Sequence, residues 1–410
     1  MRRLALAAAA AVLLVGATAL PAEAYGWTTA WTASQQPAFA GFEGPNWSVE
    51  GFANHSVRQV VRVTATGPLV RIRLSNAYGS KPLEVAGATI ARTDQGATVD
   101  KRSLRRLTFG GRPATTIAQG RETASDPALL PVKALDKLTV TLYLREPSGP
   151  ATFHELGLAP TYRANGDHRF DAGGGAFTET TNSTYFLTGV DVLAARQHGT
   201  VVLLGDSITD GYGTTSGADN RYPDELAERI ARSPQRHKLA VANAGISGDL
   251  LLTDVPCFAD SARTRFGRDV LAQPDVRTVV VHIGINDIGT GGLDLGCAQP
   301  PVATARALIA AHRSLIRAAH ARGIEVIGTT ILPMKGTPMY DTVEHEAVRD
   351  SFNHWVRTSG MYDAVVDFDQ VLRDPTNLDA LLPAYDSGDH LHPSDAGAHA
   401  MAKAIKLSSL

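Results

Sequence analysis

The sequence predicts an α/β protein in which a doubly wound, flavodoxin-like three-layer domain follows an antiparallel β-sandwich domain. Up to about residue 196, apolar residues alternate with polar ones at a period of two. From Gly199 onward, apolar runs alternate with helical periodicities. The length of 410 residues, 44% of them hydrophobic, exceeds one hydrophobic core and agrees with two domains.

The charge balance excludes one class of partner. The formal net charge is −2, from 39 Lys and Arg against 41 Asp and Glu, and the sequence contains no run of basic residues. Binding of a polyanion needs clustered positive charge. We therefore expect no nucleic-acid partner.

Residues 1–24 have the pattern of a secretory signal peptide. Two arginines precede an apolar stretch over residues 4–20, and a small-x-small sequence ends at Ala24. A retained membrane anchor is the alternative. No other stretch approaches the ~18 consecutive apolar residues of a spanning helix. We expect an extracellular protein without stable membrane anchoring.

The chain contains two cysteines, Cys257 and Cys297. In an exported protein, pairing is the default for two cysteines. Cys257 follows the segment at 243–249 and Cys297 the segment at 284–287, which places both on loops at the same predicted edge of the α/β sheet, so we expect a disulfide between them. Two free, buried cysteines are the alternative.

Residues 25–196 are predicted to form the β sandwich, with a jelly-roll-like arrangement. Segments 70–74 and 138–144 alternate between apolar and polar residues, which predicts strands buried on one face. Turn clusters rich in glycine, asparagine and proline separate the strands, at 76–79, 110–113 and 173–175.

Residues 197–410 are predicted to form the three-layer domain, because strands and helices alternate strictly. The expected strands are 200–204, 239–242, 276–283, 324–330 and 364–368. The expected helices are 223–233, 261–273, 302–322, 342–358 and 395–407. In such a sheet, functional sites form at the carboxyl ends of the strands.

The first of these strands leads into the sequence Gly-Asp-Ser-Ile-Thr-Asp-Gly at 205–211. Glycines permit a tight turn from strand to helix, which places the Ser207 hydroxyl at the rim of the sheet. A nucleophile is useful there. Helix capping by the Asp-Ser pair is the alternative interpretation.

The second and third strands lead into 243–249 and 284–287. A glycine N–H at Gly248 and the amide of Asn286 can supply fixed donors to a developing oxyanion. Ordinary turns are the alternative for each segment taken alone.

The last helix is preceded by Asp-Ser-Gly-Asp-His-Leu-His-Pro at 386–393. Asp389 can orient the ring of His392, whose other nitrogen would face a hydroxyl. The alternative is a metal site. Its ligands would be Asp386, Asp389, His390 and His392.

In their order and their positions, these four segments resemble the SGNH (GDSL) hydrolase superfamily across roughly residues 199–407. The first segment has Ile208 where the family name has leucine. This position only packs against other apolar residues, so the difference does not affect the resemblance. The β domain looks like the amino-terminal module of secreted bacterial esterases of this superfamily.

This resemblance implies a catalytic triad and an oxyanion hole, and no metal or organic cofactor. The implied triad is Ser207, Asp389 and His392. The implied oxyanion donors are the backbone N–H groups of Ser207 and Gly248 and the Asn286 amide.

The resemblance implies a secreted serine esterase that hydrolyses carboxylic esters through an acyl-enzyme. Small or polysaccharide esters would be its substrates, with short acyl groups preferred because the loops after the three strands are small and polar. The β domain could add an apolar wall through Phe39, Phe42 or Trp47. The alternatives are a lipase or lysophospholipase, a carbohydrate-binding protein with a non-catalytic α/β domain, and a metal-dependent phosphoesterase.

Overall fold

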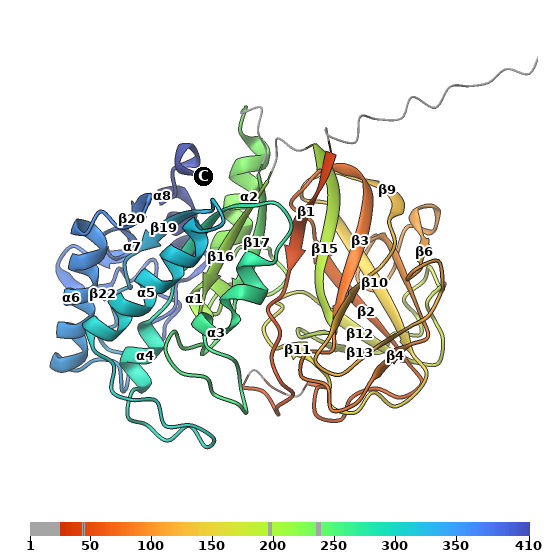
Figure 1. The fold of residues 1–410 in the computed structure, drawn as a ribbon, viewed down its shortest axis with the longest axis horizontal. Helices are drawn as coiled ribbons and strands as arrows, with labels where there is room; N and C mark the ends of the chain where they lie inside the picture. Colours follow the sequence, from red (N-terminus) through yellow and green to blue (C-terminus); the bar gives the residue numbers. More distant parts are fainter. Residues whose placement is uncertain (1–24, 43, 45, 196–198, 235–238) are drawn as a thin grey trace, which may run out of the picture.

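The computed structural model describes residues 25–42, 44, 46–195, 199–234 and 239–410. The predicted signal peptide at 1–24 and the predicted domain boundary at 196/197 lie outside these residues. Figure 1 shows an amino-terminal part built of strands beside a carboxyl-terminal part built of strands and helices. The predicted fold class is confirmed in both parts.

The amino-terminal part consists of two antiparallel sheets whose apolar faces share one core. The first has the order β1 (Tyr25–Thr32), β15 (Leu187–Ala195), β3 (Gly67–Ser75) and β8 (Glu122–Ala124), and β9 (Ala128–Val132) also pairs with β3. The second has the order β13 (Glu179–Thr181), β12 (Thr161–Asn165), β2 (His55–Arg62), β10 (Lys137–Leu144), β5 (Gly87–Arg92) and β6 (Arg105–Leu107). Two short pairs complete this part: β4 (Leu83–Val85) with β7 (Thr115–Ile117), and β11 (Phe153–His154) with β14 (Thr184–Tyr185).

Strand β3 has the predicted alternation, whereas β10 does not. In β3, Val70 and Ile72 are buried and Arg71 between them is partly exposed. In β10, Thr139 and Thr141 are buried as well as the leucines, so the prediction of a half-buried strand is wrong there.

The outer face of β10 is covered by a loop that follows β12. Arg58 of β2 donates from Nε to the Thr141 hydroxyl (3.0 Å) and from its terminal nitrogen to the backbone carbonyl of Asp171 (2.7 Å). The Phe177 ring stacks on the same guanidinium at 3.9 Å. Thr141 is therefore buried with its hydroxyl bonded to this arginine, and the hydroxyl of Thr139 pairs with that of Thr93 (2.8 Å). Such long-range contacts leave no periodicity in the sequence.

The carboxyl-terminal part has a parallel sheet of five strands in the flavodoxin-like order. Its strands are, in spatial order, β17 (Ala240–Gly245), β16 (Thr200–Gly205), β18 (Val276–His282), β19 (Glu325–Thr329) and β20 (Ala364–Val366). A small hairpin of β21 (Arg373–Asp374) and β22 (Asn377–Leu381) follows. The three strands that lead into the predicted site segments, β16, β17 and β18, fall close to their expected positions.

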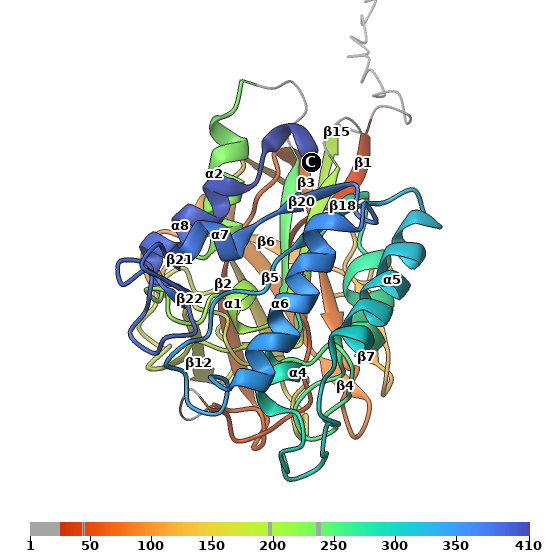
Figure 2. The same ribbon diagram turned by 90° about the vertical axis from the view of Figure 1, so that its left-hand side faces the viewer.

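Helices cover both faces of this sheet. They are α1 (Ser207–Asp210), α2 (Tyr222–Arg232), α3 (Ala262–Phe266), α4 (Ile285–Thr290), α5 (Ala305–His320), α6 (Val343–Thr358), α7 (Phe368–Leu372) and α8 (Asp395–Ala404). Helix α2 packs on α8 and α5 packs on α6, and Figure 2 shows these pairs on different sides of the sheet. Helix α5 begins later than expected because the Thr304 hydroxyl caps it by accepting the N–H of Ala307.

The two parts meet along the edge of the parallel sheet. The Thr64 hydroxyl donates to the carbonyl of Val241 (2.8 Å) and accepts its N–H (2.9 Å), so a side chain of the β domain occupies the hydrogen-bonding groups of edge strand β17. Ala240 of β17 belongs to the core of the β domain. The β domain thus closes an edge that would otherwise need protection.

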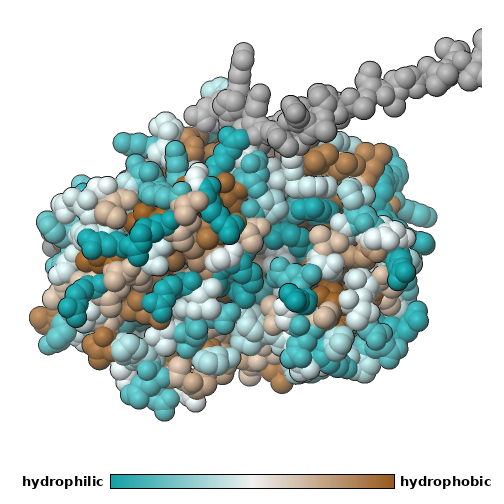
Figure 3. All heavy atoms as spheres, viewed as in Figure 1, coloured by the Kyte–Doolittle hydropathy of each residue, from teal (hydrophilic) through white to brown (hydrophobic). Residues whose placement is uncertain are grey.

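The surface carries both hydrophilic and hydrophobic residues. On the face drawn in Figure 3, hydrophobic side chains form small, separate patches among hydrophilic ones. Among the described residues, we find no helix with the length and apolar character needed to span a membrane.

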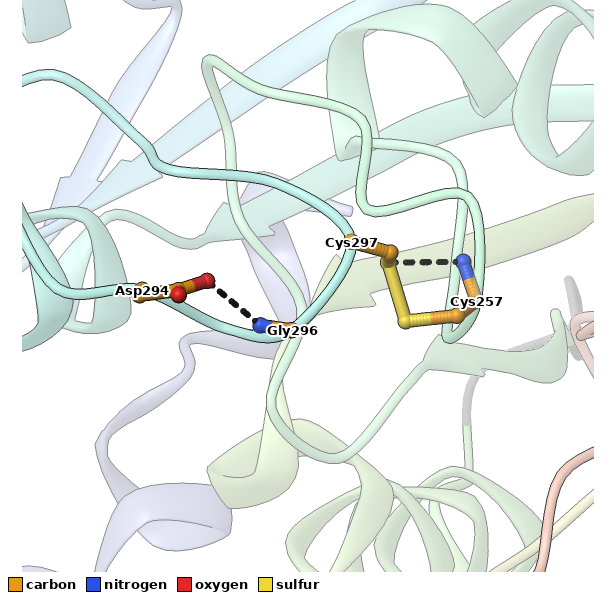
Figure 4. The surroundings of a disulfide bond; sticks show 4 residues. All are labelled: Cys257, Asp294, Gly296 and Cys297. Carbon is orange, nitrogen blue, oxygen red and sulfur yellow. Dashed lines mark hydrogen bonds between the residues drawn. A yellow bond between two sulfur atoms is a disulfide. The ribbon is translucent and has the colours of Figure 1, made fainter.

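The predicted disulfide is present. Cys257 and Cys297 are bonded, with their Cα atoms 6.0 Å apart, and join the loops that follow β17 and α4 (Figure 4). The N–H of Cys257 lies 3.0 Å from the sulfur of Cys297. Just before Cys297, the side chain of Asp294 accepts the N–H of Gly296 and closes a turn.

Replacement of both cysteines by serine should lower the free energy of unfolding by up to about 4 kcal/mol, because the bond closes a loop whose ends are 40 positions apart. Denaturant unfolding of the double variant would measure this. The unsubstituted protein in a reducing agent is the control and should match the variant. An unchanged free energy of unfolding would show that the bond has no stabilising role.

Candidate active site

Ser207 lies at the junction of β16 and α1, at the carboxyl end of the sheet. The helix cap is the Asp206 side chain, which accepts the N–H of Ile208 (3.1 Å). The Ser207 hydroxyl is therefore free for another partner and lies 2.8 Å from Nε2 of His392. Burial raises the pKa of Asp206 to about 8, so this carboxyl group is largely protonated at neutral pH.

His392 and Asp389 lie in the loop before α8 and face each other. Nδ1 of His392 is 2.5 Å from Asp389, whose other oxygen accepts the N–H groups of Leu391 (2.9 Å) and His392 (2.8 Å). A carboxylate only accepts hydrogen bonds, so Nδ1 carries the proton and the lone pair of Nε2 faces Ser207. Burial opposes ionisation of Asp389, but the hydrogen bonds from His392 and Leu391 outweigh it and hold the pKa well below its usual range.

The other two residues of the metal-site alternative form a separate pair. His390 lies 2.7 Å from Asp386 through Nδ1 and is exposed. Within the part of the chain that the structure describes, no group of three or more His, Cys, Asp or Glu side chains is arranged to hold a metal ion.

The Asn286 amide, in the first turn of α4, is held from both ends. Its nitrogen donates to the carbonyl of Asp249 (2.9 Å), and its oxygen accepts the hydroxyl of Tyr340 (2.8 Å). These two bonds fix the orientation of the amide and leave its second N–H for another acceptor. Tyr340 lies in a loop that carries no periodic signal, so the sequence did not point to it.

The backbone N–H groups of Ser207 and Gly248 also lack acceptors among the described residues. Gly248 has φ +76°, and a Cβ atom there would lie 3.0 Å from the Phe258 ring, so glycine fits this position best. The three predicted oxyanion donors are thus each able to donate a hydrogen bond. Their catalytic role stays a prediction.

Two buried carboxylates hold the loop that contains Gly248. Asp287 accepts the N–H groups of Leu251 (2.7 Å) and Leu252 (2.9 Å). Asp210, at the end of α1, accepts both the N–H and the hydroxyl of Ser247 at 2.9 Å. The helix that begins with Ser207 is therefore bonded directly to the residue before Gly248.

His154 reaches this arrangement from the β domain. Its Nδ1 lies 2.9 Å from the carbonyl oxygen of Ser34 and its Nε2 lies 3.0 Å from Asp210. Both groups accept hydrogen bonds, so both ring nitrogens carry protons and the ring is an imidazolium. Burial of His154 opposes protonation, but the charge and hydrogen bond of Asp210 outweigh it and raise the pKa. A lone histidine in a β segment gave no sequence signal for this role.

Part of the suggested apolar wall exists. Phe39 and Phe42 contact Phe258 of the carboxyl-terminal part, with ring centroids 5.1 and 5.3 Å apart, and Phe42 is 73% exposed. Trp47 instead stacks on Tyr185 of the β-domain core at 5.7 Å. The wall therefore lies next to Gly248 and excludes Trp47.

Replacement of His154 by glutamine should lower the free energy of unfolding by about 3 kcal/mol near pH 6, because the buried Asp210 carboxylate loses its cation. The raised pKa of His154 sets the pH dependence. The stabilisation is complete below about pH 6.5, the ordinary pKa of histidine, and is lost as pH rises through the raised pKa. Denaturant unfolding at a series of pH values would measure both effects.

His320→Gln is the matched control, since His320 forms a partly exposed ion pair with Asp363 at 2.8 Å. Its replacement should change the free energy of unfolding by less than about 1 kcal/mol. A difference for His154→Gln that is independent of pH, or no larger than the control, would contradict a buried imidazolium–carboxylate pair.

Comparisons with known proteins give a family match and a set of similar solved structures. Residues 203–400 match the model of the GDSL-like Lipase/Acylhydrolase family. Similar solved structures include a lipolytic protein of the G-D-S-L family from Desulfitobacterium hafniense DCB-2, with 22% identity over 50% of this chain and 97% of that chain and a TM-score of 0.38. Another is an acetylxylan esterase from Geobacillus stearothermophilus, with 23% identity over 50% of this chain and 91% of that chain and a TM-score of 0.38.

Among curated proteins, none matches the chain. The family match spans all four segments that the sequence singled out, from the end of β16 to α8. Residues 203–400 therefore form a domain of the GDSL-like lipase/acylhydrolase family, and the protein is a carboxylic ester hydrolase.

Proposed function

We propose that the protein is a secreted serine esterase that removes short acyl groups through an acyl-enzyme, with Ser207, His392 and Asp389 as its triad. The observation that carries this proposal is the continuous chain of contacts from the Ser207 hydroxyl through the His392 ring to Asp389, at 2.8 and 2.5 Å. This is the arrangement in which a base activates a hydroxyl and a carboxylate orients the base.

In the first half of the reaction, the Ser207 hydroxyl oxygen attacks the ester carbonyl carbon while Nε2 of His392 takes its proton. The tetrahedral intermediate carries its negative charge on the former carbonyl oxygen. Collapse of this intermediate breaks the bond to the alcohol oxygen, which receives the proton from His392, and leaves Ser207 acylated. Asp389 stabilises the imidazolium that forms between these steps.

Water then repeats the sequence on the acyl-enzyme. His392 takes a proton from water, the hydroxide oxygen attacks the acyl carbon, and collapse releases the carboxylic acid with the proton returned to Ser207. In both halves, the N–H groups of Ser207, Gly248 and Asn286 would donate to the oxyanion. Support for this role comes from the two bonds that fix the Asn286 amide before substrate arrives.

Secretion is supported by two features. Residues 1–24 have the charged, apolar and small-residue regions of a signal peptide. The disulfide between Cys257 and Cys297 is of the kind that persists in oxidising compartments.

Ser207→Ala should lower kcat/KM for ester hydrolysis by a factor on the order of 10⁴–10⁶, because no other group attacks the carbonyl carbon. The free energy of unfolding should change by less than about 1 kcal/mol, since only one oxygen is removed. Ester hydrolysis assays and denaturant unfolding measure the two quantities.

The matched control is Ser80→Ala, at an exposed serine of the β domain. It should keep full activity, and a fluorophosphonate should label this control and the unsubstituted protein at Ser207. If the kcat/KM of Ser207→Ala lies within tenfold of the control, Ser207 is not the nucleophile.

Over a series of p-nitrophenyl esters, kcat/KM should be highest from acetyl to about butyryl. Each methylene gains about 0.8 kcal/mol only where an apolar groove receives it, and the loop after Ser207 presents Tyr212, Gly213 and Thr214. The exposed Phe42 ring is one apolar surface near the site, too small for a long chain. A maximum at about eight carbons or longer would indicate a lipase or lysophospholipase instead.

A further inference from the structure

A cleft of about 590 Å³ lies between the segment that follows α1 and the β domain. One wall is the segment 212–216, directly after α1, and the other comes from segments 155–158 and 180–183 of the β domain. The walls are joined where the N–H of Gly217 donates to the carbonyl of Leu158 (2.9 Å). This volume is typical of small-molecule sites.

The cleft lies beside the candidate triad, with Tyr212 between them. The Tyr212 ring lines it and contacts the His392 ring, with centroids 4.4 Å apart. The N–H of Tyr212 donates to the carbonyl of Ser207 at 2.9 Å, so this loop is fixed relative to the nucleophile. Because His392 must protonate the departing alcohol, the oxygen of that alcohol lies within hydrogen-bonding reach of Nε2. An alcohol part that extends from there past Tyr212 would enter the cleft.

The lining of the cleft is polar but carries no cation. Hydroxyl side chains come from both walls, including Thr181 and Ser183 on one and Thr214 and Ser216 on the other; the β-domain wall adds the amide of Asn182 and the carboxylate of Glu155. The described lining residues include no lysine or arginine. The phosphate of a phospholipid head group would lack a charged partner there. Neutral hydroxyl groups, in contrast, can both donate to and accept from such a lining.

The cleft also offers apolar surface for a ring. Leu156, Leu158 and the face of Tyr212 border it. The aliphatic face of a sugar ring can pack on such side chains while its hydroxyls bond to the polar ones. The side chains of Asn182 and Ser216 are exposed and have no hydrogen-bond partner among the described residues, so they remain open to a ligand.

We propose that this cleft binds the alcohol part of the ester and that this alcohol is a neutral polyhydroxylated ring such as a sugar. The inference rests on the proposed esterase mechanism. It assigns a task to the β domain, which supplies one wall of the leaving-group site and thereby contributes to substrate selection.

The test compares two acetate esters of similar ring size on the full-length mature protein, a mono-acetylated methyl glycoside and cyclohexyl acetate. The unsubstituted protein should have at least a tenfold higher kcat/KM for the glycoside. The double variant Asn182→Ala/Ser216→Ala should lower the ratio of the two kcat/KM values about tenfold, mainly through KM, because two hydrogen bonds to the sugar are lost.

The matched control is Thr116→Ala, an exposed threonine of β7 on another surface of the β domain. It should leave the ratio unchanged. A preference for cyclohexyl acetate, or an equal loss on both acetates in the double variant, would each overturn the assignment of the cleft. Absence of hydrolysis of either acetate, together with no fluorophosphonate labelling of Ser207, would instead refute the esterase mechanism itself.

Discussion

The geometry of the site depends on one buried guanidinium group. The side chain of Arg265, in α3, is fully shielded from solvent and donates to the backbone carbonyls of Gly205 (2.9 Å) and Ala244 (2.8 Å). These carbonyls lie at the carboxyl ends of β16 and β17, where the loops with Ser207 and Gly248 begin. Arg265 also forms an ion pair with Asp249 (2.7 Å), the residue after Gly248, so it holds this loop at a second point. Arginine suits this position because its planar fork presents five donors in fixed directions.

The same guanidinium group ties the β domain to the site. Arg265 donates to the Ser34 hydroxyl (3.1 Å), and the Ser34 carbonyl accepts from His154 (2.9 Å). His154 in turn holds Asp210, which holds Ser247. A buried charge is costly unless it is paired and fully hydrogen-bonded, so removal of one partner would leave the others unsatisfied. Ser34, which follows β1, is therefore part of the support of the candidate active site.

The sequence predicted the parts of the candidate site whose chemistry is local. Asp389 and His392 are three positions apart in one loop, and Ser207 directly follows a buried strand, so short patterns carried these predictions. The partners that orient them were not predictable in this way. Tyr340 meets Asn286 across 54 positions and His154 meets Asp210 across a domain junction. A single tyrosine in a loop or a single histidine in a strand has no periodicity, and its pairing emerges only when the chain is folded. The buried outer face of β10 was missed for the same reason.

The junction between the two parts has a buried portion, held by charged hydrogen bonds, and an exposed portion at the cleft. Beneath the strand ends, Arg265, Asp249 and Asp269 are buried, and every displacement there would break charged hydrogen bonds. At the cleft, the two walls consist of loops with exposed side chains such as Asn182 and Ser216, which bond to nothing else in the described chain. Changes in those side chains would leave the Arg265 contacts in place. The fold therefore separates the residues that set the geometry of catalysis from those that can select the alcohol, and the β domain contributes to both.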